Sequence, residues 1–278
     1  MPRFEVHPGF SLHVDISGHG PPVVLLHGFT GAADGWGEFR DLLDEQFTTY
    51  AIDIIGHGRS DKPYGVERYR MATAVEDLVS LSELAGARHA AWVGYSMGGR
   101  TALHVAVAQA GKIRCLALVG GSPGLATEAE RDARVTSDEA LADRIERGGV
   151  EAFVDHWESI PLFETQRRLA PDVRSRIRAG RLANEARGLA NSLRGMGTGA
   201  QPPLFDALGD LAIPSLFLAG EEDPKFAAIG QDMAAAAANA SFATVPGAGH
   251  AAQLENPSAV AAKVIPFLRH VFNQGEQR

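Results

Sequence analysis

The sequence has a single cysteine, Cys115, among its 278 residues, so no disulfide can form within one chain. Cys115 opens the apolar run 115–119, and we expect it to be a small core residue. Apolar runs long enough to cross a membrane are missing. The first residues also lack the cationic start and continuous apolar core of a secretory signal. We therefore expect a cytoplasmic protein without a membrane span.

Basic residues are in deficit: 26 Lys and Arg stand against 34 Asp and Glu, for a net charge of −8. Nonspecific nucleic-acid binding needs a basic face, so it is not expected. A hydrophobic fraction of 45% with 31 glycines and 15 prolines excludes a disordered, collagen-like or coiled-coil chain. The length allows an ordinary buried core. The oligomeric state stays open, and a homo-oligomer is compatible with the sequence.

Short aliphatic runs bounded by turns alternate with helical patterns along much of the chain. Such runs are typical of buried parallel strands, and we predict strands over 23–26, 49–53, 91–93, 116–119, 214–220 and 241–245. Helical spacing predicts helices over 72–85, 99–110, 226–238 and 257–272. Strands and helices in this order predict an α/β fold, with a mostly parallel sheet covered by helices on both faces.

The segment 125–201 differs from the rest of the chain. Strand-like runs disappear there, and arginine, glutamate and alanine alternate in helical patterns, with 12 arginines against 13 acidic residues. We predict a helical cap over 125–201, inserted into a core made of 1–124 and 202–278. Most of the net negative charge then lies on the core.

Residues 94–98 read Gly-Tyr-Ser-Met-Gly, between a predicted strand and a predicted helix. This G-x-S-x-G pattern is typical of the nucleophile elbow of α/β-hydrolase folds, where a strained turn exposes the serine and glycines avoid collisions with the neighbouring strand and helix. We predict Ser96 as a catalytic residue.

A serine needs a histidine to take its proton and an acid to orient that histidine. In α/β-hydrolase folds the order along the chain is serine, acid, histidine. Residues 221–223 follow one predicted strand and His250 follows the next. Glu221 and Glu222 compete for the acid role, but Asp223 lies farther past the strand end, so we predict Asp223 and His250 as the partners of Ser96.

An oxyanion hole needs main-chain N–H groups aimed at developing negative charge. We expect them from Met97, which follows the serine, and from Phe29, in the turn after the first core strand. His27 and His57 are interpreted as structural histidines of turns. His7, His13 and His19 lack carboxylate or cysteine companions in the sequence, so we expect neither a metal nor another cofactor.

Residues 191–202 carry the run Leu-Arg-Gly-Met-Gly-Thr-Gly-Ala-Gln-Pro. This run closely resembles a signature of the 2-succinyl-6-hydroxy-2,4-cyclohexadiene-1-carboxylate (SHCHC) synthase family of menaquinone biosynthesis. Residues 94–100, 156–163, 223–226 and 245–250 resemble the same family. The resemblance, over roughly 20–270, implies a carbon–oxygen lyase that eliminates pyruvate from a small anionic substrate, an enolpyruvyl cyclohexene with three carboxylates, by triad-assisted proton abstraction.

The resemblance also implies cationic partners for those carboxylates, and the planar fork of arginine suits them. It assigns substrate binding to Arg100, Arg134, Arg181 and Lys225, with Tyr95 and Trp157 lining the site. Two alternatives stay open. The first alternative is a carboxylesterase or carbon–carbon bond hydrolase with Ser96 as nucleophile, and the second is a noncatalytic binding protein on the same fold. The intact order of serine, aspartate and histidine along the chain argues against the second alternative.

Overall fold

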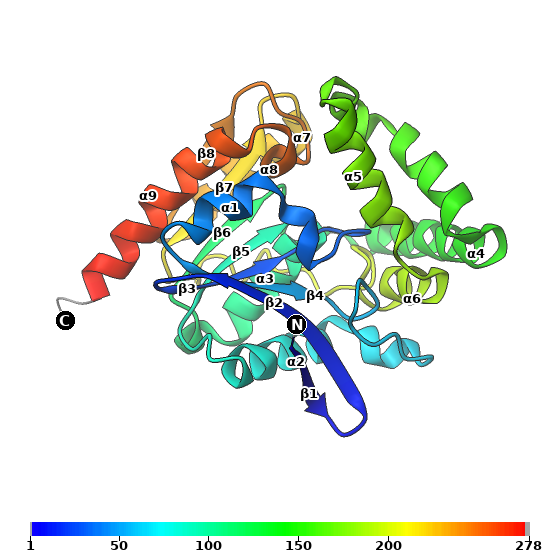
Figure 1. Cartoon of the computed structure of the whole chain (residues 1–278), viewed down its shortest axis with the longest axis horizontal. Coiled ribbons are helices and arrows are strands. Elements are labelled where there is room, and N and C mark those ends of the chain that lie inside the picture. Colours follow the sequence, from blue (N-terminus) through cyan, green and yellow to red (C-terminus); the bar gives the residue numbers. More distant parts are fainter. Residues whose placement is uncertain (1, 276–278) are drawn as a thin grey trace.

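A computed structural model describes residues 2–275 as a sheet of eight strands in the order β1-β2-β4-β3-β5-β6-β7-β8 (Figure 1). The hairpin strand β1 pairs antiparallel with β2, and β2 pairs antiparallel with β4, whereas all other neighbours are parallel. The strands are β1 (Arg3–His7), β2 (Phe10–Gly18), β3 (Pro22–Leu26), β4 (Thr48–Asp53), β5 (Ala91–Tyr95), β6 (Cys115–Val119), β7 (Ser215–Gly220) and β8 (Ala240–Val245). The predicted mostly parallel α/β sheet is confirmed.

Helices cover both faces of the sheet. Successive strand residues point to opposite sides, so each central strand supplies apolar side chains to both faces. Val24 and Leu26 of β3 belong to one apolar cluster, and Val23 and Leu25 to the other. The first cluster includes residues of α2 (Met71–Leu84), α3 (Met97–Ala108) and α7 (Pro224–Ala236). The second includes residues of α1 (Glu38–Asp44), α8 (Ala252–Glu255) and α9 (Pro257–Gly275).

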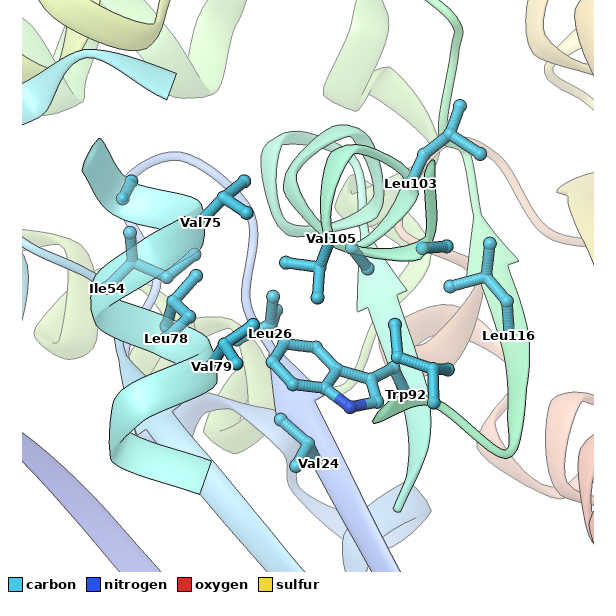
Figure 2. Packing of buried hydrophobic residues seen from close by; sticks show 14 of the residues in the cluster. Val24, Leu26, Ile54, Val75, Leu78, Val79, Trp92, Leu103, Val105 and Leu116 are labelled. Carbon is cyan, nitrogen blue, oxygen red and sulfur yellow. The ribbon is translucent and has the colours of Figure 1, made fainter. Parts of the chain in front are cut away.

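Trp92 of β5 is a large side chain of the first cluster. Figure 2 shows Val79 from α2, Val105 from α3 and Val24 from β3 around its indole ring. The Trp92 side chain is 2% exposed, and burying such a ring contributes a large share of a local core's stability. This packing fixes α3, and with it the turn at the start of α3.

The chain between β6 and β7 forms a separate helical layer, here called the cap. It holds α4 (Glu128–Ser159), interrupted at Gly149 where φ is 80°, the 3₁₀ segment η4 (Pro161–Arg168), α5 (Pro171–Leu182) and α6 (Ala186–Met196). A capping box of Thr127 and Glu130 begins α4. Figure 1 shows α4, α5 and α6 grouped on one side of the molecule, away from α9.

A small apolar cluster holds the cap together. Phe153 and Val154 of α4 pack with Leu189 and Leu193 of α6, and Phe29 of the core packs against them. One core side chain therefore reaches into the cap from the loop after β3.

Two histidines of the N-terminal hairpin correct an expectation. His13 Nδ1 lies 2.9 Å from Asp53 Oδ2, and His7 Nε2 lies 2.7 Å from Asp77 Oδ1, so both have the carboxylate companions that the sequence did not reveal. The carboxylates come from β4 and α2, which only the folded sheet brings near the hairpin.

Cys115 is fully buried on β6, and burial raises the pKa of its thiol to about 12. Within residues 2–275, no helix is both long and apolar enough to cross a bilayer.

Candidate active site

Ser96 occupies a strained turn between β5 and α3. Its φ of 50° and ψ of −109° lie in a region that non-glycine residues rarely adopt. A side chain at Gly94 would come within 2.5 Å of the Gly98 carbonyl oxygen, and one at Gly98 would overlap the carbonyl of Leu26 on β3. The two glycines therefore let the serine turn fit between the strand and the helix.

A chain of hydrogen bonds runs from Ser96 through His250 to Asp223. Ser96 Oγ lies 2.9 Å from His250 Nε2, and His250 Nδ1 lies 2.8 Å from Asp223 Oδ2. His250 and Asp223 are 3% and 7% exposed, so the hydrogen bond between their side chains is shielded from water. Such a chain lets a histidine exchange a proton with a serine while the acid holds its ring in place.

The competing acids are engaged elsewhere. Glu222 forms an ion pair with Arg168 at 2.7 Å, and Glu221 accepts a hydrogen bond from the Gly247 amide. Asp223 begins α7, where its second carboxylate oxygen accepts from the Phe226 amide. The helix start thus orients the carboxylate towards the histidine.

His27 shapes the turn that carries Phe29. Its Nε2 accepts from the Ile54 amide at 3.1 Å, so its Nδ1 carries the proton and donates to the Gly28 carbonyl at 2.8 Å. In a trans peptide the carbonyl and the next N–H point in opposite directions, so the Phe29 N–H points away from His27. Burial lowers the pKa of His27, which keeps the ring neutral.

Met97 is the first residue of α3, and its N–H therefore has no partner within the helix. Gly28 lies against the site as well, since a side chain there would come within 2.7 Å of the Tyr95 ring. The two amides predicted to bind an oxyanion thus come from the start of α3 and from the loop after β3, which both adjoin Ser96.

A cleft of about 930 Å³ opens beside these loops. Its walls include Phe29, Tyr95, Phe163, Gln166 and Arg181. Core loops form one side and the cap forms the other, the usual arrangement for a ligand site at the carboxyl ends of parallel strands.

The predicted arginines fall into two groups. In the first, Arg100 is 9% exposed and donates to the Met196 carbonyl at 3.1 Å and to the Gln201 side-chain oxygen, while Arg134 pairs with Asp138 at 2.8 Å. Burial, with a smaller contribution from Arg134, lowers the pKa of Arg100 to about 10. The guanidinium of Arg100 is thus a buried cation held mostly by neutral oxygens.

Arg181 forms the second group, on α5. Its Nη1 lies 3.0 Å from Glu158 Oε1, its Nη2 donates to Gln166 Oε1 at 2.9 Å, and its guanidinium stacks on the Phe163 ring at 5.0 Å. The Phe163 ring in turn lies 6.3 Å from the His250 ring. The arginine is 7% exposed and lines the cleft.

Of the remaining predicted residues, Tyr95 lies beside His250, and the centroids of the two rings are 5.5 Å apart. Trp157 packs on Phe29 and Phe163, and its buried indole Nε1 has no hydrogen-bond partner within residues 2–275. Lys225 is exposed, with its ammonium 5.8 Å from the Phe226 ring centre, and it does not line the cleft.

The chain is similar to proteins of one enzyme family. The family model for the alpha/beta hydrolase fold matches residues 21–257. A Bacillus subtilis (strain 168) protein provisionally named 2-succinyl-6-hydroxy-2,4-cyclohexadiene-1-carboxylate synthase is 42% identical over 249 residues, 90% of each chain. The synthase of that name from Photorhabdus laumondii is 34% identical over 258 residues, 91% of this chain and 87% of that protein. The chain belongs to the SHCHC synthase family.

A solved structure described as MenH from S. aureus has a TM-score of 0.88 and 30% identity, covering 93% of this chain and 98% of that one. The resemblance read from the sequence is thereby confirmed. In this SHCHC synthase family member, the signature run 191–202 includes Gln201, whose side-chain oxygen accepts a hydrogen bond from Arg100.

Sequence reasoning assigned no role to Gln166, Phe163 or Asp138. Gln166 and Phe163 line the cleft, and Asp138 pairs with Arg134. The run 156–163, which resembles the family, includes Phe163 and was the available signal for it. Gln166 carried no comparable signal.

Proposed function

We propose that this protein eliminates pyruvate from 2-succinyl-5-enolpyruvyl-6-hydroxy-3-cyclohexene-1-carboxylate to give SHCHC, a step of menaquinone biosynthesis. Membership of the synthase family supports this activity. The observation that carries it is the hydrogen-bonded chain Ser96, His250 and Asp223 beside a cleft whose cap side carries the buried Arg181.

In this proposal Ser96 Oγ acts as the base. It removes the substrate proton that the succinyl carbonyl acidifies, while its own hydroxyl proton moves to His250 Nε2. The positive charge on the imidazole is stabilised by Asp223 at 2.8 Å. The electron pair of the broken C–H bond moves through the ring as the C–O bond to the enolpyruvyl group breaks, so the leaving group departs as the enolate of pyruvate. The proton held by His250 is then given to this enolate, which becomes pyruvate and leaves the histidine neutral again. No water is consumed, so the reaction is that of a lyase.

The amides of Phe29 and Met97 would hold the negative charge that develops on the succinyl oxygen. Donors fixed before the reaction stabilise such charge without reorganising. Two hydrogen bonds to the Gly28 carbonyl, one from the His27 Nδ1 and one from the Gly31 amide, hold this turn and support the role.

Arg100, Arg134 and Arg181 would bind the carboxylates, with Tyr95 and Trp157 against the ring and Lys225 at the outside. Asp138 and Glu158 already pair with two of these arginines. Substrate carboxylates would therefore compete with protein carboxylates, which favours a substrate with several negative charges over a singly charged one.

The test is to incubate the purified protein with the enolpyruvyl substrate and to follow pyruvate together with the diene absorbance. In ¹⁸O-labelled water, lyase chemistry leaves no solvent oxygen in SHCHC or in the carboxylates of the products. A substrate deuterated at the abstracted position should react more slowly if proton removal limits the rate.

Ester hydrolysis is the second candidate, because the same serine, histidine and acid arrangement serves acyl transfer. Mass spectrometry of the protein during turnover separates the two. An acyl adduct on Ser96 with rapid ester turnover, and no pyruvate, would establish the hydrolase. Slow side hydrolysis of nitrophenyl acetate fits either reaction.

A further inference from the structure

Gln166 presents a buried hydrogen-bond donor that no group in the described part of the chain satisfies. The side chain is 7% exposed, and within residues 2–275 its Nε2 has no hydrogen-bond partner. A buried donor left unpaired is unfavourable, and native proteins contain few of them. Such a group at a cleft wall indicates a partner that arrives with the ligand.

The orientation of the amide is fixed by its neighbour. Arg181 Nη2 donates to Gln166 Oε1 at 2.9 Å, and an arginine has no acceptor to offer. The oxygen of the amide therefore faces Arg181 and the NH₂ group faces elsewhere. The 3₁₀ segment η4 holds the main chain of Gln166, whose carbonyl accepts from the Leu169 amide.

Gln166 and Arg181 line the same cleft as Phe29 and Tyr95. The guanidinium of Arg181 uses Nη1 for Glu158 and Nη2 for Gln166. A carboxylate that approaches Arg181 within the cleft thus meets a neighbouring amide with two unused N–H bonds. Charge-assisted hydrogen bonds of this kind are the strong ones.

We propose that Gln166 is a specificity-determining residue that donates from Nε2 to the same substrate carboxylate that binds Arg181. This inference rests on the proposed function for the identity of the anion. Gln166 does not touch the reacting atoms in this proposal, and it acts on substrate affinity.

The substitution Gln166→Glu keeps the size of the side chain and its acceptor for Arg181, but it replaces the donor by a negative charge. Gln166→Met removes both polar atoms. In the wild-type background each should lower kcat/KM roughly 10- to 100-fold, mainly through KM, because one hydrogen bond to a charged group is lost. Gln231→Met makes the same chemical change on the exposed face of α7 and should leave KM unchanged.

Two further readouts separate donation from mere packing. In Ser96→Ala protein, calorimetry gives the Kd of the unreacted substrate. The loss caused by Gln166→Glu should shrink as pH falls from 8 to 5, because a protonated carboxyl can donate as the amide does. With Arg181→Met added, Gln166→Met should cost less than it does alone, since both side chains serve one carboxylate.

Pyruvate release by the wild type with unchanged KM in both Gln166 variants would overturn the inference and leave the proposed function standing. Equal effects of Gln166→Met with and without Arg181, or a pH-independent defect in Gln166→Glu, would also overturn it. Substrate binding that depends on Gln166, without any pyruvate release by the wild type, would instead reject the proposed function alone.

Discussion

Arg100, one turn into α3, donates a hydrogen bond from Nη1 to the carbonyl of Met196, the last residue of cap helix α6. The helix that follows the serine turn is therefore fastened to the cap by a buried cation. In the proposed reaction, the side chain that attaches the cap also binds the substrate.

Arg100→Met should lower both activity and stability. A substrate carboxylate would lose its partner in a desolvated site, which lowers kcat/KM by an amount equivalent to roughly 2 to 5 kcal/mol. Gln201 and Met196 would lose a hydrogen-bond donor, which lowers the free energy of unfolding by about 1 to 3 kcal/mol. Pyruvate release and urea unfolding measure the two. Arg100→Lys keeps the charge and should recover part of the stability; wild-type kcat/KM in Arg100→Met would remove Arg100 from substrate binding.

Ser96→Ala and His250→Ala should each reduce pyruvate release by about 10³-fold or more, because residues of such a unit act together. Asp223→Asn should be less severe if another acid orients the histidine. Steady-state rates with matched circular dichroism spectra make the comparison. Near-wild-type turnover by Ser96→Ala would take the serine out of the mechanism.

Trp157→Phe should leave stability almost unchanged, because the indole Nε1 gives up no hydrogen bond within the described chain and the ring contacts with Phe29 and Phe163 are largely kept. KM should rise if that N–H binds substrate. Thermal unfolding and KM are the measurements. A clear loss of stability with an unchanged KM would make Trp157 a packing residue only.

Gly98→Ala should destabilise the fold by about 3 kcal/mol, since the added methyl group would overlap the Leu26 carbonyl of β3 and main-chain atoms cannot step aside. Gly111→Ala adds the same methyl group where no atom lies within 4 Å and should change little. Denaturant midpoints of the two variants test the steric explanation; equal midpoints would contradict it.

Acid should weaken the protein through two buried histidines. Burial lowers the pKa of His57 to about 3 and, helped by Arg100, that of His104 to about 4, both below the usual 6.5. The unfolded chain therefore binds more protons than the folded chain in this pH range. As a result, the free energy of unfolding falls as pH drops from about 6.5 towards 4.

Each of these histidines adds about 1.4 kcal/mol per pH unit to that slope. His104→Leu should flatten it by about one proton, whereas His156→Leu, on the exposed face of α4, should not. Urea unfolding between pH 4 and 7 provides the slopes. An unchanged slope in His104→Leu would show that His104 is protonated in the folded state.

The core of the fold was open to prediction because its signals are local. Each predicted strand coincides with an observed one to within two residues, since aliphatic runs bounded by turns are typical of a covered parallel sheet. The choice of Asp223 over Glu221 and Glu222 followed from its place in the loop, and Asp223 is the acid next to His250. The antiparallel hairpin β1–β2 was not assigned, because its apolar residues alternate with polar ones and form none of the continuous aliphatic runs on which the other strands were predicted.

The polar partners in the cap could not be predicted. Glu158 and Arg181 are 23 residues apart on different helices, and Gln166 sits in a 3₁₀ segment without a clear periodicity. Such pairs depend on how the cap helices pack. A single sequence with many arginines and glutamates is compatible with many different pairings, so it does not identify the observed one. The family resemblance pointed to the arginines, whose role in substrate binding stays a prediction, but no signal in the sequence pointed to the side chains that hold them.

The buried thiol of Cys115 makes the protein convenient for site-specific labelling. Its high pKa and complete burial leave almost no thiolate for a maleimide at neutral pH, and the chain has no other cysteine. A cysteine introduced on the exposed cap, as in Arg147→Cys, and another on the core, as in Lys112→Cys, would each take a spin label cleanly. The distance between two such labels would report directly whether the cap opens when substrate arrives.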